Sequence, residues 1–310
     1  MDHGTPPGFA MPRRAARPAL SVTAAALLLA GCASTPPPAD SPAALRALLP
    51  KAVRGSGVLR IGAALNYRPV DFRDDDGAPA GLDIDLANAL AGRLGLKAQF
   101  TGQPFDTLIP DVQQHRLDLA MAGVVDTRRR EAGVDADGRQ TDPGVDFVDY
   151  FLTGTAIVVR SGDPLGIVTL DDLCGRRVAL QRGTIQAEIA ARQAAVCQKT
   201  GKELTVDQFD TDDQALAELA SGQAAAGLQD YPVATWDTRP GNSRGQFQVT
   251  GAMLQTSPYG ITVNKADTGL RDALAKTLDQ LITDGSYGTI LDKWGAQGGA
   301  LPSSEVNGGF

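Results

Sequence analysis

The chain has 310 residues, with 29 Lys and Arg against 36 Asp and Glu and a formal net charge of −7. This acidic balance, without a cluster of basic residues in the folded region, argues against nucleic acid as a partner, because phosphate recognition needs an excess of Lys and Arg on one face. His3 and His115 are the only histidines and no Cys/His ligand spacing occurs, so the sequence predicts neither a metal site nor a cofactor.

The N-terminal segment has the layout of a secretory signal. Three arginines between positions 13 and 17 precede an apolar run from Ala19 to Ala30. The run has about 12 residues, whereas roughly 20 are needed to cross a bilayer. Basic, apolar and small residues in this order are typical of a cleaved signal peptide. Met11 is an alternative start to Met1, because the first ten residues lack signal character.

Leu29-Ala30-Gly31-Cys32 closes the apolar run and resembles a lipobox, in which the bond before the cysteine is cut and Cys32 carries lipid. This resemblance implies a lipoprotein signal peptide over 1–31. It also implies that the mature chain is anchored outside the cytoplasm, at the cell surface or in the periplasm. The alternative is a plain signal peptide with an incidental cysteine. Residues 32–50 begin with a proline-rich stretch and are expected to form an extended tether.

Setting Cys32 aside leaves Cys174 and Cys197 as an even pair in an oxidising compartment, which predicts a disulfide. A disulfide that closes a loop of about two dozen residues stabilises the folded state by roughly 3 kcal/mol. The alternative is two buried free thiols.

From about residue 58 onward, short apolar runs alternate with stretches of helical periodicity. Buried strands are predicted at 58–64, 117–125, 177–181 and 224–228. Helices are predicted at 83–94, 105–114, 185–197, 211–219, 270–281 and 287–294. Strands alternating with helices indicate an α/β protein with parallel or mixed sheets.

Two such α/β units follow one another, and the extended segments near 152–155 and 256–259 are able to link them as a two-strand hinge. The predicted domains are a first lobe at 51–154 and 257–295, a second lobe at 155–256, and a disordered Gly/Pro/Ser-rich tail at 296–310. Ligands of open α/β sheets bind beyond the carboxyl ends of the strands. The candidate site therefore lies in the loops at 64–67, 123–130, 181–186 and 229–231.

Seven short motifs in fixed order resemble the type II periplasmic solute-binding proteins of ABC importers, in the branch that binds polar amino acids (bacterial solute-binding protein family 3). They are LRIG (59–62) with NYRP (66–69), GLDIDL (81–86), FDTLIP (105–110), DTRRRE (126–131) with VDFVDY (145–150), GT (183–184), QD (229–230), and DGSY (284–287) with KWG (293–295). No single motif is specific, but their order over most of the chain is. The resemblance implies the two-lobed periplasmic-binding-protein-like type II fold.

The resemblance also implies roles for individual residues. Arg130 corresponds to the arginine that binds the ligand carboxylate, and Asp230 to the aspartate that binds its ammonium group. Tyr67 and Phe105 correspond to the aromatic pair that flanks the ligand side chain. Gly183 lies between a strand and a helix, where free N–H groups attract an anion.

Other positions depart from the family pattern. Val125 and Ile185 stand where the family commonly has hydroxyl residues, so only their backbone N–H groups remain as donors, and either binding is weaker or the ligand is not a standard amino acid. Ala64 replaces an acid that binders of basic amino acids often have, which makes lysine, arginine and histidine less favoured. Gln181 favours a polar neutral ligand, and Gly123 completes the candidate set.

The resemblance therefore implies a monomeric, non-enzymatic lipoprotein that captures an amino acid or a related zwitterion by hinge closure and delivers it to an ABC permease. One alternative is an enzyme on the same fold, similar to cyclohexadienyl dehydratase. Such an enzyme would need a positioned acid or base; His115 falls on a predicted helix away from the strand ends, and Glu188 is the only glutamate close to a cleft loop. The other alternative is an amino-acid sensor lipoprotein without a transporter.

Overall fold

The computed structural model describes residues 40–162, 165–239 and 246–310. The predicted signal peptide, Cys32 with its predicted lipid, and the first part of the predicted tether lie outside these residues. Within the described ranges, no helix has both the length and the apolar character needed to cross a bilayer.

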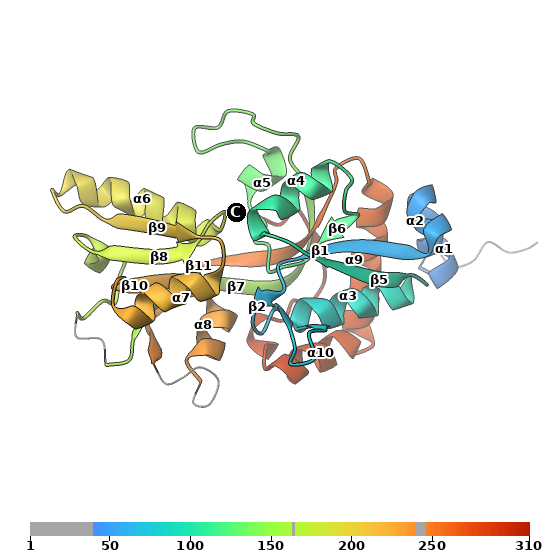
Figure 1. Cartoon of the computed structure of the whole chain (residues 1–310). Coiled ribbons are helices and arrows are strands. Elements are labelled where there is room, and N and C mark those ends of the chain that lie inside the picture. Colours follow the sequence, from blue (N-terminus) through green and yellow to red (C-terminus); the bar gives the residue numbers. More distant parts are fainter. Residues whose placement is uncertain (1–39, 163–164, 240–245) are drawn as a thin grey trace, which may run out of the picture. The chain divides into compact units, whose positions relative to one another are not determined.

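The first lobe is built on parallel strands (Figure 1). Strand β1 (Val58–Ala63) pairs with β5 (Lys97–Gly102) on one side and β6 (Leu119–Ala120) on the other, with α3 (Leu82–Arg93) and α4 (Leu108–Gln113) in the connections. The strand predicted at 117–125 is shorter than expected. Gly123 has a φ of 61°, and its N–H donates to the Asp83 carboxylate instead of a neighbouring strand. The chain therefore leaves the sheet after Ala120 and meets it again at Val125, which forms an isolated antiparallel bridge with Tyr259.

The second lobe repeats this plan. Strand β8 (Arg177–Gln181) pairs in parallel with β9 (Thr205–Phe209) and β10 (Ala226–Asp230). The helices of this lobe are α6 (Ile185–Lys199), α7 (Asp212–Ser221) and α8 (Tyr231–Asp237). The side chains of Thr184 and Thr211 cap α6 and α7, and Gln214 completes the capping box of α7. These caps fix where the loops after β8 and β9 end.

Two long antiparallel strands, β7 (Asp146–Arg160) and β11 (Phe247–Val263), link the lobes. Strand β6 pairs with β11, and β10 pairs with β7, so the order β5-β1-β6-β11-β7-β10-β8-β9 runs through both lobes. The predicted α/β fold with mixed sheets and two linking strands is confirmed. In addition, the sheets are continuous through the hinge, and a small sheet of β2 (Asn66–Tyr67), β3 (Asp71–Arg73) and β4 (Pro79–Ala80) lies beside α3.

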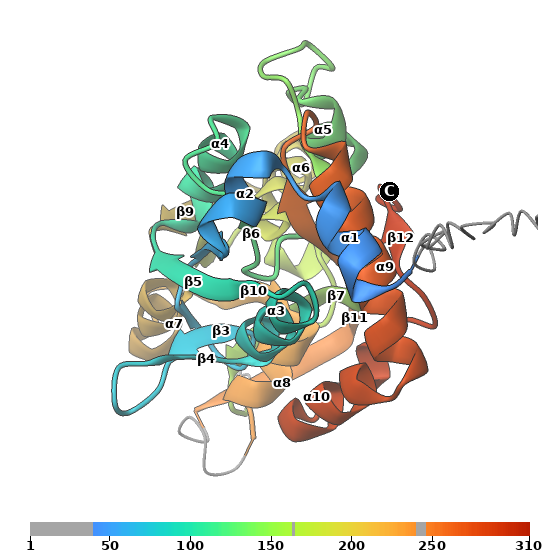
Figure 2. The same ribbon diagram turned by 90° about the vertical axis from the view of Figure 1, so that its right-hand side faces the viewer.

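The prediction that 32–50 is an extended tether is wrong for the part that the structure describes. Helix α1 (Pro42–Leu48) begins at the Ser41 cap and packs on α9 (Thr268–Thr283), as Figure 2 shows, and α2 (Lys51–Ser56) follows. Leu45 and Leu49, four residues apart, are 1 % and 3 % exposed. Proline at the first position of a helix does not interrupt it, so the leucine spacing decides the structure.

The prediction of a disordered tail at 296–310 is also wrong. After α10 (Ser286–Trp294), the chain forms the 3-10 turn η3 (Gln297–Gly299) and then β12 (Glu305–Val306), which pairs antiparallel with β7. The strand β7 offers backbone partners that composition cannot reveal, and these order the segment.

The predicted disulfide between Cys174 and Cys197 is present, with a Cα–Cα distance of 5.2 Å. It joins the turn after η2 (Asp171–Leu173) to the last turns of α6. Cys197 is fully buried, and the Gln193 amide lies 3.6 Å from both sulfur atoms.

Candidate functional site

A cavity lies beyond the carboxyl ends of β1, β6, β8 and β10, where residues of both lobes meet. Its empty volume, which includes space open to solvent, is about 320 Å³. It contains every predicted ligand-binding residue except Gly183. The lining residues are Ala64, Tyr67, Phe105, Ala122, Gly123, Val125, Arg130, Gln181, Thr184, Ile185, Gln186 and Asp230.

Arg130 is held in place on the first-lobe side of the cavity. It lies in α5 (Arg128–Ala132), where its N–H donates to the Thr127 hydroxyl that caps the helix. Its Nη1 donates to the Val125 carbonyl at 2.6 Å and its Nη2 to the Gly183 carbonyl at 2.9 Å. Burial lowers the pKa of Arg130, while neighbouring carboxylates raise it; the guanidinium remains a fixed cation.

Gly183 contributes differently from the prediction. Its carbonyl accepts from Arg130, and the residue lies outside the cavity lining. Its φ of 77° brings its Cα close to Asp106 of the other lobe, and an added Cβ would lie 2.9 Å from the Asp106 Cβ. Gly183 therefore allows close approach of the lobes.

Asp230, at the end of β10, supplies the carboxylate on the second-lobe side. It is 5 % exposed, and it accepts a 2.9 Å hydrogen bond from the Tyr67 hydroxyl and another from the Gln186 amide. Burial raises its pKa to about 6, and these hydrogen bonds and Arg130 limit the rise. Asp230 is therefore largely ionised at neutral pH and faces a cation on the opposite lobe.

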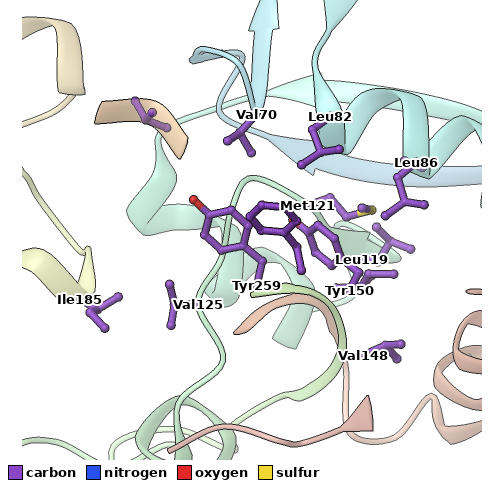
Figure 3. Close-up of a cluster of buried hydrophobic side chains, with 14 of the residues drawn as sticks. Val70, Leu82, Leu86, Leu119, Met121, Val125, Val148, Tyr150, Ile185 and Tyr259 are labelled. Carbon is purple, nitrogen blue, oxygen red and sulfur yellow. The ribbon is translucent and has the colours of Figure 1, made fainter. Parts of the chain in front are cut away.

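The aromatic and apolar walls come from both lobes. Tyr67 and Phe105 are half-buried, and the Phe105 ring centroid lies 5.9 Å from the Arg130 guanidinium carbon. Val125 and Ile185 are buried, and Figure 3 shows their side chains next to one another across the site. Neither side chain carries a hydroxyl group, so Val125 and Ile185 add no side-chain donor to the cavity wall.

Two buried carboxylates hold the cavity loops from behind. The Asp71 carboxylate accepts from the N–H groups of Ala64 and Leu65 at 2.6 and 2.9 Å. The Asp83 carboxylate accepts from the Gly123 N–H at 2.8 Å and from the Tyr150 hydroxyl at 2.7 Å, and burial raises the pKa of Asp83 to about 7. Loops without regular pairing are thus fixed by side chains.

Thr184 and Gln186 line the cavity and lie in the predicted loop 181–186, although neither was singled out as a binding residue, and Ala122 lies just before the predicted loop 123–130. Gln186 carried a detectable signal, because positions 186, 190, 193 and 197 fall on one face of α6 and all are buried. Gln186 and Gln193 are polar residues on a buried face whose other two members, Ala190 and Cys197, are small. Among the described residues, no group of three or more His, Cys, Asp or Glu is arranged to hold a metal ion.

Two α/β lobes joined by two strands, with an arginine and an aspartate facing one cavity, define a two-lobed binding protein. The family model of the bacterial extracellular solute-binding proteins, family 3, matches residues 59–297. The chain belongs to this family, which confirms that part of the predicted resemblance.

Individual relatives extend the comparison. The chain is 28 % identical to the arginine-binding protein ArgT of Corynebacterium glutamicum, over 96 % of this chain and 97 % of that protein. It is 26 % identical to the lysine/arginine/ornithine-binding periplasmic protein of Escherichia coli, over 76 % of this chain and 86 % of that protein.

Solved structures agree with these relatives. An ancestral arginine-binding protein bound to arginine is 33 % identical with a TM-score of 0.68, covering 77 % of this chain and 98 % of its own. The ancestral amino acid-binding protein AncCDT-1, a precursor of cyclohexadienyl dehydratase, is 29 % identical with a TM-score of 0.67. The match covers 78 % of this chain and 97 % of that one.

Proposed function

We propose that this protein is a lipid-anchored, extracytoplasmic receptor that captures a polar amino acid between its lobes and delivers it to an ABC permease. The observation that carries the proposal is the placement of Arg130 and Asp230 on opposite lobes around one small cavity. Membership of a solute-binding family and the names of the relatives support it. The anchor rests on Cys32, and a monomer suffices because one chain supplies both charges.

A zwitterionic amino acid matches the two charges of the cavity. The guanidinium of Arg130 offers planar N–H donors to an α-carboxylate, and Asp230 offers an acceptor to the ammonium group. Tyr67 and Phe105 would flank the ligand side chain. A Kd near 1 μM corresponds to about 8 kcal/mol, which two charge-assisted contacts and the burial of the side chain are able to supply.

The lining favours a neutral polar side chain. Asp230 is the only carboxylate among the described residues that line the cavity, and the ligand ammonium would use it. Ala64 adds no charge, and Gln181 adds an amide. The names of the relatives favour arginine, which makes arginine the competing ligand. We propose glutamine-like ligands before arginine.

Hinge closure follows from contacts that join the lobes. The Tyr67 hydroxyl reaches Asp230, Arg130 reaches the Gly183 carbonyl, and Arg129 forms a 2.6 Å ion pair with Glu188. A ligand that touches both lobes binds the closed form more tightly than the open form and so shifts the population toward it.

We propose no catalytic step. His115 Nδ1 lies 3.3 Å from the Asp267 carboxylate, Glu188 forms an ion pair with Arg129, and neither His115 nor Glu188 lines the cavity. The likeness to AncCDT-1 keeps dehydration as the alternative. Turnover of prephenate or arogenate by the purified protein would establish that alternative.

Calorimetric titration of the purified protein with the twenty amino acids tests the function. We expect binding of at least one polar amino acid, with glutamine tighter than arginine. Arg130→Met and Asp230→Asn should each weaken binding about 100-fold or more, because each leaves a charge of the buried ligand unpaired. Arg128→Met is the matched control, since this exposed arginine of the same helix lies outside the cavity.

The outcomes separate the claims. If no amino acid binds the wild-type protein, the proposed function is wrong. If both site variants bind as the wild type does, the site is wrong. A tighter Kd for arginine than for glutamine would overturn only the preference for a neutral side chain.

A further inference from the structure

The last six residues, 305–310, lie against the turn that carries Arg130. We call them the C-terminal strap. They fall beyond residue 297, where the match to the family model ends. Figure 1 marks the C-terminus beside α5, and the strap nevertheless contributes no residue to the cavity lining.

Hydrogen bonds fasten the strap to β7 along its length. Val306 pairs with Val148 in an antiparallel ladder, and Asn307 follows it. The Asn307 amide accepts from the Phe147 N–H at 2.8 Å and donates to Asp146 at 3.2 Å. These contacts align the remaining three residues with α5.

The end of the strap holds the residues between Val125 and Arg130. The buried Gly309 donates its N–H to the Asp126 carboxylate at 3.0 Å. The Phe310 carbonyl accepts from the Arg128 N–H at 3.3 Å, which satisfies a donor that the first turn of α5 cannot pair internally. The strap thus contacts both sides of Thr127, the cap of the helix that carries Arg130.

The fit at Gly309 is close. A Cβ at this position would lie 2.7 Å from both Asp126 Oδ1 and Glu131 Oε1. Gly308 donates to Asp149 at 3.0 Å. Three carboxyl groups therefore gather under two strap N–H groups, and burial raises the pKa of Asp126 to about 9 and that of Asp149 to about 7. Such a cluster needs hydrogen-bond donors to keep its geometry.

We infer that the C-terminal strap is a positioning element for Arg130, which sets the orientation of the carboxylate-binding arginine without touching the ligand. This inference rests on the proposed function only for the identity of what Arg130 binds. Removing the strap would free the Asp126–Arg128 turn and so weaken ligand binding while leaving both lobes folded.

Two variants and one control test the inference. The first is the chain ended after Ser304, and the second is Gly309→Ala, whose methyl group is directed at two carboxylates. Gly298→Ala is the control, because nothing lies within 4 Å of a Cβ built there. The Kd for the amino acid bound most tightly by the wild type is measured by calorimetry at a temperature where circular dichroism shows each protein folded.

We expect the shortened chain to bind about tenfold or more weakly and Gly309→Ala to bind measurably more weakly, with Gly298→Ala within about twofold of the wild type. Hydrogen exchange should rise at the amides of 126–132 in both variants, and in the shortened chain also at the β7 amides that pair with the strap, but not elsewhere in the first lobe. The peptide of residues 305–310, added in excess to the shortened chain, should restore affinity, which a general loss of stability would not allow.

Wild-type affinity in both variants overturns the inference and leaves the proposed function intact. If the wild type itself binds no amino acid, the proposed function is wrong. In that case, unchanged hydrogen exchange at 126–132 in Gly309→Ala would separately overturn the inference that the strap positions Arg130. If the shortened chain does not fold, Gly309→Ala carries the test alone.

Discussion

At the scale of the residue, the ionisation of Asp230 in the cavity depends on its surroundings. It accepts from Tyr67 and Gln186 and faces Arg130, yet burial still raises its pKa to about 6. Desolvation thus outweighs several favourable interactions. The site keeps its anion only because the donors converge on it.

The pH dependence of binding follows from this pKa. An ammonium ligand requires the ionised carboxylate, so the Kd should rise as the pH falls below about 6, toward tenfold per pH unit, until the pKa of the bound form is reached. The opposite sign holds for stability: the folded pKa lies above the ordinary value, so this group favours the folded state at low pH and loses that contribution as the pH rises through about 6.

Titrations between pH 5 and 8 check the prediction, with Asp230→Asn as the control. Its residual affinity should lack the change near pH 6. A wild-type Kd that stays constant over this range would show that Asp230 does not bind the ammonium group.

Most of the cavity residues could be predicted because each directly follows a predicted strand or matches a motif. Arg130, Asp230 and Tyr67 were found in this way. The orientation of peptide groups could not be predicted. The Gly183 carbonyl accepts from Arg130, and the sequence does not predict this contact because it depends on how the two lobes meet.

At the scale of the element, the errors lie at the two ends of the folded region. Proline content suggested a tether before residue 50, and glycine content suggested disorder after residue 296. Both segments are ordered by partners distant in sequence: α1 packs on α9, and β12 pairs with β7. Composition reports the local cost of ordering a segment but not the contacts that offset that cost.

Helix α1 offers a matched pair of substitutions. Leu45 is 1 % exposed and Leu48 is 41 % exposed on the same short helix. Leu45→Ala should lower the free energy of unfolding by about 2 to 5 kcal/mol, because it leaves a cavity in the core. Leu48→Ala should change it by less than about 0.5 kcal/mol. Urea unfolding measures both, and equal values would show that α1 does not belong to the folded core.

At the scale of the whole molecule, alternation of strands and helices was enough to predict the α/β fold and the two linking strands. The continuity of the sheet was not predictable, because it depends on β6 pairing with β11 and β10 pairing with β7. Pairings between strands so far apart in sequence leave no trace in local periodicity.

The disulfide is expected to stabilise the molecule without shaping the site. Its loop spans 23 residues and lies within the second lobe, at the end of α6 away from Gln186. Replacing Cys174 and Cys197 together by Ser should cost about 3 kcal/mol. The Kd of the ligand should stay within about twofold. Unfolding and titration of the double variant check both expectations, with reduced wild-type protein as the control, and a large change in Kd would show that α6 depends on the bridge.

The largest apolar cluster contains side chains of both lobes, among them Leu59 and Leu86 from the first and Ile157 and Val178 from the second. Strands β7 and β11 run through it, so the lobes share a core as well as a hinge. We therefore expect the two lobes to unfold in one cooperative transition, which calorimetric melting of the purified protein checks. A ligand that closes the cleft would therefore protect distant parts of both lobes from unfolding, including surfaces that it never contacts.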